Sequence, residues 1–150
     1  METTEKTVNV LNDLIEINND RVAGFEKAIA DIKDENIDLK AIFQDFATQS
    51  RTFGQELSAL VGGYAGNLET GESVASTLHR AWIDVKSLFG GNDRHGILAE
   101  AERGEDAIKK AYSDALAGGS LTGEALNTVQ QQATDIKSAH DKIKALRDLS

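Results

Sequence analysis

The chain has 150 residues, of which 40% are hydrophobic and 27% charged, a composition that predicts one globular domain over residues 1–150. It contains no cysteine, which excludes disulfide frameworks, thiolate metal sites and cysteine nucleophiles. The formal net charge of -9 opposes binding to nucleic acid or anionic membranes, and METTEK at the start carries no secretion signal, so we expect a cytoplasmic protein.

The first half of the chain predicts two long helices, because it has no proline and its apolar residues recur every three or four positions. The first helix spans about 4–33 with the stripe Val8, Leu11, Ile15, Asn18, Val22, Phe25, Ile29 and Ile32. Asp34 or Asn36 caps the second, whose stripe is Leu39, Phe43, Phe46, Ser50, Phe53, Leu57 and Leu60. In an antiparallel hairpin Asn18 faces Ser50, and a hydrogen bond between them would fix the register.

The second half predicts three more helices. Leu-x-Gly-Gly occurs at 60–63, 88–91 and 116–119, and glycine there closes a helix in the left-handed conformation. We expect a loop over 64–72 and a shorter helix over 73–89. Asn92 or Asp93 caps a fourth helix with the stripe Leu98, Ala101, Glu105, Ile108, Tyr112 and Ala115. Ser120 or Thr122 starts the fifth, with the stripe Leu126, Val129, Ala133, Ile136, His140 and Ile143.

These elements predict an all-α fold, a ferritin-like four-helix bundle with a short helical crossover between two antiparallel hairpins. Short turns make sequential helices antiparallel neighbours. The helix over 73–89 is only about 25 Å long, against about 43 Å for the first, which is typical of a crossover that returns the chain along a bundle.

His140 interrupts the stripe of the last helix at a position where a leucine would pack, so its imidazole needs a partner inside the bundle. Helix levels estimated from the turns place it level with Ala99 and about one turn from Glu102. The same estimate brings His79 beside Glu102, with Glu26 and Glu105 as additions. Such imidazoles and carboxylates on facing helices can hold iron, manganese or zinc.

A structural network is the interpretation that we favour for these residues. In it, Glu102 and Glu105 pair with Arg103, Arg80 or the histidines. A di-iron carboxylate site requires two Glu-x-x-His motifs, but the residue three positions before His140 is Lys137. The ligand set for two metals is therefore incomplete.

Four stretches carry a family resemblance: LNDLIEINND from Leu11, STLHRAW from Ser76, ILAEAERGEDAIKKAY from Ile97 and HDKIKALRD from His140. They resemble bacterial four-helix-bundle proteins that are catalogued as a domain of unknown function and grouped with ferritin-like folds. The resemblance covers most of the chain and implies the fold. It transfers no catalytic residue.

The leading hypothesis is a non-enzymatic cytoplasmic bundle, stress-associated or an interaction module, that needs no cofactor. A homodimer or an unidentified protein partner fits this interpretation. The alternative is a metal-binding protein or metal-dependent oxidase with a degenerate site. Its candidate ligands are Glu102, His140, His79, Glu105 and Glu26.

Overall fold

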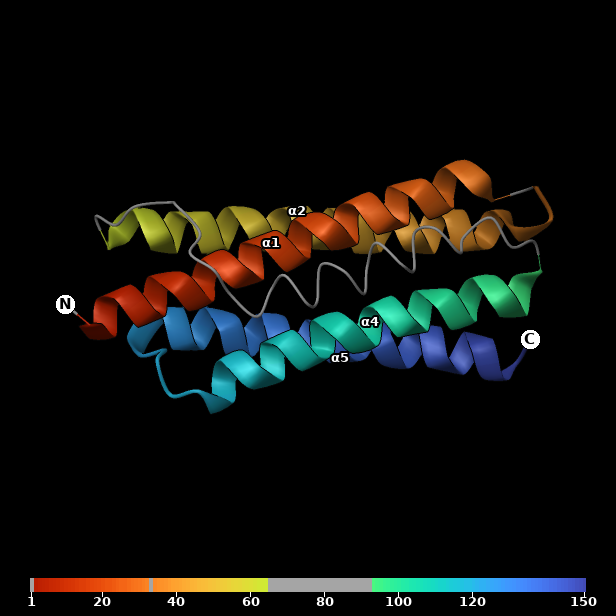
Figure 1. Cartoon of the computed structure of the whole chain (residues 1–150). Coiled ribbons are helices and arrows are strands. Elements are labelled where there is room, and N and C mark those ends of the chain that lie inside the picture. Colours follow the sequence, from red (N-terminus) through yellow and green to blue (C-terminus); the bar gives the residue numbers. More distant parts are fainter. Residues whose placement is uncertain (1, 33, 65–92) are drawn as a thin grey trace.

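The computed structural model describes residues 2–32, 34–64 and 93–150, and these form an all-α bundle without a strand. Its elements are α1 (Glu2–Asp31), the 3-10 helix η1 (Asp34–Asn36), α2 (Ile37–Gly63), α4 (Arg94–Ala117) and α5 (Gly123–Asp148). The four α-helices lie side by side (Figure 1). The predicted helix over 73–89, with His79, and the Leu-x-Gly-Gly sequence at 88–91 lie outside the described residues.

Each α-helix packs against two others. Helix α1 contacts α2 and α4, and α5 contacts α4 and α2. The starts of α2 and α4 meet at one end of the bundle, where Arg94 donates hydrogen bonds of 2.9 and 2.7 Å to the two carboxylate oxygens of Asp38. At the other end, Thr7 Oγ1 near the start of α1 donates to the backbone oxygen of Ser120. None of the described helices is long and apolar enough to cross a membrane.

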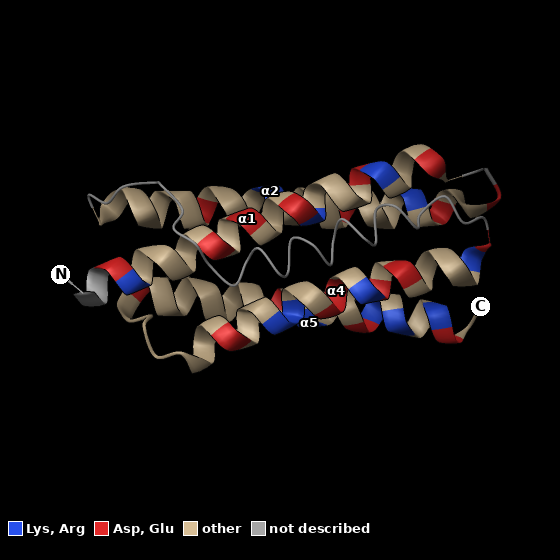
Figure 2. Ribbon diagram, in the orientation of Figure 1, with Lys and Arg blue, Asp and Glu red and all other residues tan. Residues whose placement is uncertain are grey.

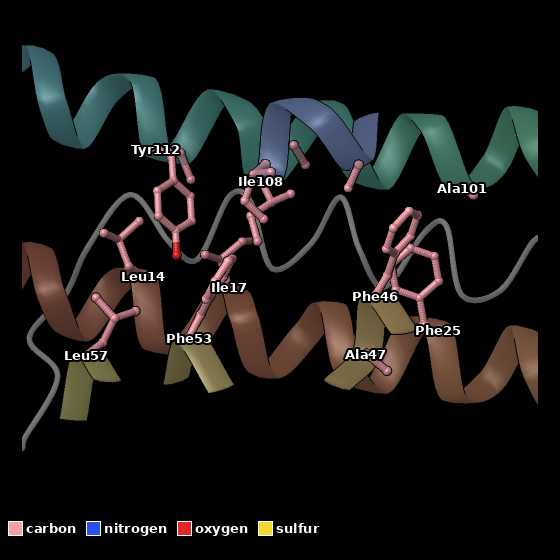
Figure 3. Close-up of a cluster of buried hydrophobic side chains, with 14 of the residues drawn as sticks. Leu14, Ile17, Phe25, Phe46, Ala47, Phe53, Leu57, Ala101, Ile108 and Tyr112 are labelled. Atoms are coloured by element: carbon pink, nitrogen blue, oxygen red, sulfur yellow. The ribbon is translucent and has the colours of Figure 1, made fainter. Parts of the chain in front are cut away.

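The apolar stripes predicted for α2 and α4 form much of the core. Every predicted stripe residue of α4 is buried, and on α2 the prediction holds from Leu39 to Leu57, after which Val61 is buried in place of Leu60. Aromatic rings fill the space between α1 and α2, where the ring centroids of Phe25 and Phe43 are 5.0 Å apart. Figure 3 shows Phe25 and Phe46 in one interior cluster with side chains of α4 such as Ile108.

The predicted stripe of α1 is confirmed at Val8, Leu11, Asn18, Phe25 and Ile32 and is wrong at three positions. Ile15, Val22 and Ile29 are only partly buried. The buried positions follow a heptad-like repeat through Leu11, Leu14, Asn18, Arg21, Phe25, Ala28 and Ile32. At the three wrong positions the buried residue is the preceding one, Leu14, Arg21 or Ala28, because the inner face of α1 packs against α2 and α4 together. The same shift occurs on α5, where Gln132 is buried and Ala133 only partly so.

Two predicted helix boundaries show different local chemistry. Asp93 is the N-cap of α4, as predicted, and its side chain accepts a 2.7 Å hydrogen bond from the backbone N–H of Gly96. Thr122 is the N-cap of α5, but its side chain makes no capping hydrogen bond. After α4 the chain turns at Gly119, whose φ of 75° is the left-handed conformation expected there.

These two caps provide a matched pair of substitutions. We expect Asp93→Ala to lower the free energy of unfolding by about 1 kcal/mol, because the N–H of Gly96 loses its acceptor. Thr122→Ala removes no capping bond and should cost less. Urea unfolding of both variants measures the difference. Equal losses would contradict the assignment of Asp93 as the stabilising cap.

Candidate functional site

Arg21 is the largest fully buried side chain of the described residues, and it forms an ion pair inside the bundle. Its Nε and Nη2 donate to the two carboxylate oxygens of Glu105, at 2.9 and 3.2 Å. Both side chains are completely shielded from solvent. The pair joins α1 to α4 with the two-pronged geometry that guanidinium and carboxylate groups favour.

The remaining guanidinium nitrogen of Arg21 turns toward α2. Nη1 donates to Gln49 Oε1 at 2.8 Å, to Ser50 Oγ at 2.9 Å and, more weakly, to the backbone oxygen of Phe46 at 3.4 Å. The guanidinium carbon also lies 5.5 and 5.4 Å from the ring centroids of Phe25 and Phe46. Hydrogen-bond acceptors and aromatic faces therefore replace the water that this cation loses on burial.

A hydrogen-bond chain continues from Ser50 across the whole bundle. Ser50 Oγ donates to Asn18 Oδ1 at 2.8 Å, which confirms the predicted contact between these two residues. Asn18 Nδ2 donates to the hydroxyl of Tyr112 at 2.8 Å, and that hydroxyl donates to Gln132 Oε1 at 2.6 Å. Gln132 Nε2 reaches Glu56 Oε1 at 2.9 Å. We call the residues from Glu105 through Arg21, Ser50, Asn18 and Tyr112 to Gln132 the core network.

Burial raises the pKa of two groups in the core network. It raises the pKa of the Glu105 carboxyl, while the neighbouring Arg21 guanidinium opposes that rise. It also raises the pKa of the Tyr112 hydroxyl further above neutral pH, where this group is a protonated donor in any case. Figure 3 shows the Tyr112 hydroxyl directed into the interior. The core network is internally satisfied and acts as a structural lock that all four α-helices share.

A double-mutant cycle tests this lock. Arg21→Met or Glu105→Met alone should cost about 3–5 kcal/mol of unfolding free energy, because each leaves a buried charge without its partner. The double variant should recover most of that loss, since both charges leave the core together. Chemical denaturation of the four proteins gives the coupling energy. Additive losses would contradict the pairing.

A second polar cluster lies at the edge of the bundle between α4 and α5. It consists of Glu102, Asp106 and His140, whose nearest nitrogen and oxygen atoms all lie within 4.8 Å of one another. His140 Nε2 is 2.6 Å from Asp106 Oδ1 and 3.8 Å from Glu102 Oε2. His140 and Glu102 are buried, whereas 61% of the Asp106 side chain is exposed. We call these three residues the edge cluster.

Two further residues hold the edge cluster from outside. Arg147 Nη1 donates to Glu102 Oε1, so the other oxygen of Glu102 is the one that faces His140. The second ring nitrogen of His140, Nδ1, lies 3.2 Å from Asp141 Oδ1. Acidic and basic residues alternate along this part of α4 and α5 (Figure 2). Two of the three side chains that could serve as ligands, Glu102 and His140, are thus each oriented by a polar neighbour on the far side.

The structure separates the residues that sequence analysis grouped around His140. The inward position of His140 and its proximity to Glu102 are confirmed. Glu105 instead forms the ion pair with Arg21. Glu26 does not join the interior, because its side chain is 57% exposed and pairs with Arg51. Of the partners predicted for Glu102, the histidine is confirmed in His140, whereas Arg103 contacts Glu100 and Arg80 lies outside the described residues. The ion pair of Glu102 with Arg147 was not predicted.

The predicted level of His140 was wrong by about two turns, because the ring meets Asp106 rather than Ala99. Helical side chains lean toward the N-terminus of their own helix. On α4 this lean points away from the turn that leads to α5, and on α5 it points toward that turn. Two side chains that meet therefore come from residues with higher numbers than the two residues whose backbones lie at the same level. Asp106 was missed for this reason, although its spacing of four residues from Glu102 places both on one helix face.

The edge cluster offers one imidazole nitrogen and two carboxylate oxygens, which is a ligand set suited to a divalent transition-metal ion. Two atoms bound to one such ion lie at most about 4.2 Å apart, so small side-chain rotations would bring all three donors into range. The exposure of Asp106 leaves a route from solvent. The core network offers no comparable donors, because its groups already bind one another.

Comparison with known proteins identifies a family. No curated protein matches the chain. A family model described as "Domain of unknown function (DUF2383)" matches residues 6–118, which include α4 with Glu102 and Asp106 but end before α5 and His140. This match covers three quarters of the chain. The protein therefore belongs to the family described as a domain of unknown function, DUF2383.

Proposed function

We propose that this protein is a non-enzymatic, ferritin-like helical bundle that binds one divalent transition-metal ion at Glu102, Asp106 and His140. The single observation that supports metal binding most directly is the convergence of these three donors within 4.8 Å. They come from two different helices, so the ion would join α4 to α5. Zinc, manganese and iron are the metals that suit one nitrogen and two oxygen donors.

The proposed arrangement is two antiparallel hairpins, α1 with α2 and α4 with α5, joined by a helical crossover over 73–89. The order of the contacts supports the second hairpin. Along α4 the partners on α5 fall in number as the residues rise, from Glu102 with Arg147 to Asp106 with His140 and Tyr112 with Gln132. The first hairpin shows the same order, because Asn18 on α1 contacts Ser50 on α2 and Arg21 contacts the earlier residue Phe46.

The surroundings of the edge cluster favour a built site over a chance gathering of charges. Histidines that bind metals usually direct their second ring nitrogen to a carboxylate, and Asp141 occupies that place at His140 Nδ1. Ligating carboxylates are commonly held by a hydrogen bond of their own, and Arg147 holds Glu102 through Oε1. Both features would orient the donors before an ion arrives.

The ligand set supports a single ion rather than a di-iron centre. No histidine of the chain follows a glutamate by three positions, so the Glu-x-x-His motifs of di-iron bundles are missing. Glu105, another carboxylate of α4, forms the buried ion pair with Arg21. The proposed role is therefore binding of one metal ion.

Metal titration tests the proposal. Tag-free protein should bind about one equivalent of Zn²⁺ or Mn²⁺ by equilibrium dialysis and metal analysis. His140→Ala should abolish this binding, and Asp106→Asn should weaken it by at least about 10-fold without disturbing the fold, because Asp106 is exposed. Circular dichroism of each variant checks that the helices remain intact.

Two matched variants serve as controls in this titration. His95→Ala removes another histidine, one that contacts Ser150 at the end of the bundle. Glu26→Gln removes a carboxylate that pairs with Arg51 on the surface. Both should keep the stoichiometry of the natural protein. Absence of stoichiometric binding, or equal loss in His95→Ala and His140→Ala, would overturn the proposal.

The remaining expectations from the sequence stay predictions. These are the cytoplasmic location, a role in stress or as an interaction module, and a homodimer or other protein partner. His79 also stays a candidate ligand. A metal-dependent oxidase is the alternative function, and it would share the edge cluster.

A further inference from the structure

Arg147, near the end of α5, contacts Glu102 with one corner of its guanidinium. Nη1 donates a hydrogen bond to Oε1 of Glu102. The other two nitrogens of the group turn to Asp148, where Nε and Nη2 lie 3.3 and 2.9 Å from Oδ1. The Arg147 side chain is 30% exposed, whereas that of Glu102 is only 10% exposed. Arg147 thus places a positive charge against one oxygen of a carboxylate that lies largely inside the bundle.

The two oxygens of Glu102 have different surroundings as a result. Oε1 accepts the hydrogen bond from Arg147, while Oε2 lies 3.8 Å from Nε2 of His140. The same Nε2 is 2.6 Å from Oδ1 of Asp106, so the donors of the edge cluster gather on the Oε2 side. An ion bound by both oxygens would have to approach Oε1, where the guanidinium repels it. Arg147 therefore leaves Glu102 with one oxygen for an ion.

The number of oxygens that Glu102 offers matters more to some metal ions than to others. Zn²⁺ is commonly tetrahedral, with three protein ligands and one water. Mn²⁺ favours octahedral sites rich in oxygen, so a second carboxylate oxygen adds more to its binding. The edge cluster provides one ligand atom from each of its three residues. This set matches tetrahedral Zn²⁺ better than octahedral Mn²⁺.

We propose that Arg147 is a specificity-determining residue of the edge cluster, which limits Glu102 to one metal-binding oxygen and thereby favours Zn²⁺ over Mn²⁺. This inference rests on the proposed function, because it concerns which ion the edge cluster takes. Sites with nitrogen and oxygen ligands generally bind Zn²⁺ more tightly than Mn²⁺. The diagnostic quantity is therefore the change in the ratio of the two affinities when Arg147 is replaced.

Two substitutions of Arg147 separate its hydrogen bond from its general effects. Arg147→Met removes the bond and the charge, and so frees Oε1 of Glu102. The lost charge acts on two divalent ions alike and cancels in the ratio of their affinities, whereas the freed oxygen helps Mn²⁺ more. Arg147→Lys keeps the charge and can keep the bond, because only one nitrogen of Arg147 contacts Glu102.

Lys137 provides a matched control for the loss of charge. Its ammonium lies 2.8 Å from Asp141, which contacts the second ring nitrogen of His140. Lys137→Met therefore removes one positive charge from the neighbourhood of the edge cluster but changes no contact of Glu102. It should change the affinities for Zn²⁺ and Mn²⁺ by the same factor.

Competition titrations with Zn²⁺ and Mn²⁺ measure the affinity ratio in the tag-free natural protein and the three variants. Arg147→Met should shift the ratio toward Mn²⁺ by about 10-fold, the lower end of the change that loss of a ligand's hydrogen-bond partner produces. Arg147→Lys should keep most of the natural ratio, and Lys137→Met all of it. Circular dichroism checks that each variant keeps its helices.

The number of water molecules on bound Mn²⁺ gives a second readout, measured by oxygen-17 NMR relaxation of the solvent. A second oxygen from Glu102 would displace a water from the ion. Arg147→Met should therefore carry one water fewer than the natural protein, and Lys137→Met the same number. A loss of helix stability alone would not change this number.

The outcomes separate this inference from the proposed function. An unchanged affinity ratio or an unchanged water count in Arg147→Met would overturn the role of Arg147 and leave metal binding in place. An equal shift of the ratio in Lys137→Met would do the same, because charge alone would then explain it. If the natural protein binds neither Zn²⁺ nor Mn²⁺, the proposed function fails and this inference fails with it.

Discussion

The guanidinium of Arg21 has no access to solvent, and any packing of these helices must surround it with acceptors. Those acceptors come from two helices other than its own, Glu105 on α4 and Gln49 and Ser50 on α2. A slide of either helix by one turn would leave a buried charge unpaired, at a cost that apolar contacts alone would not impose. The ion pair therefore selects one register among several that the alanine- and leucine-rich faces would tolerate.

The core network also determines how α4 is rotated. Glu105 must face inward to meet Arg21, which directs Glu102 and Asp106, one turn apart on a neighbouring face, toward α5. Three acidic residues within five positions thereby receive two different roles. Burial and a cation make Glu105 part of the interior lock. The imidazole of His140 beside them and the exposure of Asp106 make Glu102 and Asp106 candidates for binding an ion.

The core network and the edge cluster differ in how many of their polar atoms already have a hydrogen-bond partner. In the core network every polar group named has a partner within the protein, so it has no donor atoms left for a ligand. In the edge cluster the imidazole of His140 and two carboxylates face one another, while Asp141 contacts the second ring nitrogen of His140 and Arg147 binds the outer oxygen of Glu102. Ligand atoms that converge on one point, with neighbouring residues that already hold their side chains in place, need little rearrangement when a cation binds.

Sequence periodicity predicted the parts of the structure that depend on one helix at a time. The buried face of α4, the cap at Asp93 and the inward direction of His140 all follow from spacing within one segment. The contact of Asn18 with Ser50 was also within reach, because a short turn relates the levels of α1 and α2. Arg21 was missed because an apolar neighbour, Val22, seemed the better stripe residue, and only the heptad through Asn18 and Phe25 points to it.

The sequence by itself therefore determined the helical class, most helix boundaries and the presence of polar residues in the core, since these depend on local backbone preferences and on the period of the helix. Only the tertiary structure decided which polar residues meet. Pairing of Arg21 with Glu105, and of His140 with Asp106, depends on how far helices separated by tens of residues are shifted and rotated against one another. Those offsets are set by side-chain packing and by the lean of each side chain along its helix, which no spacing within a single segment records.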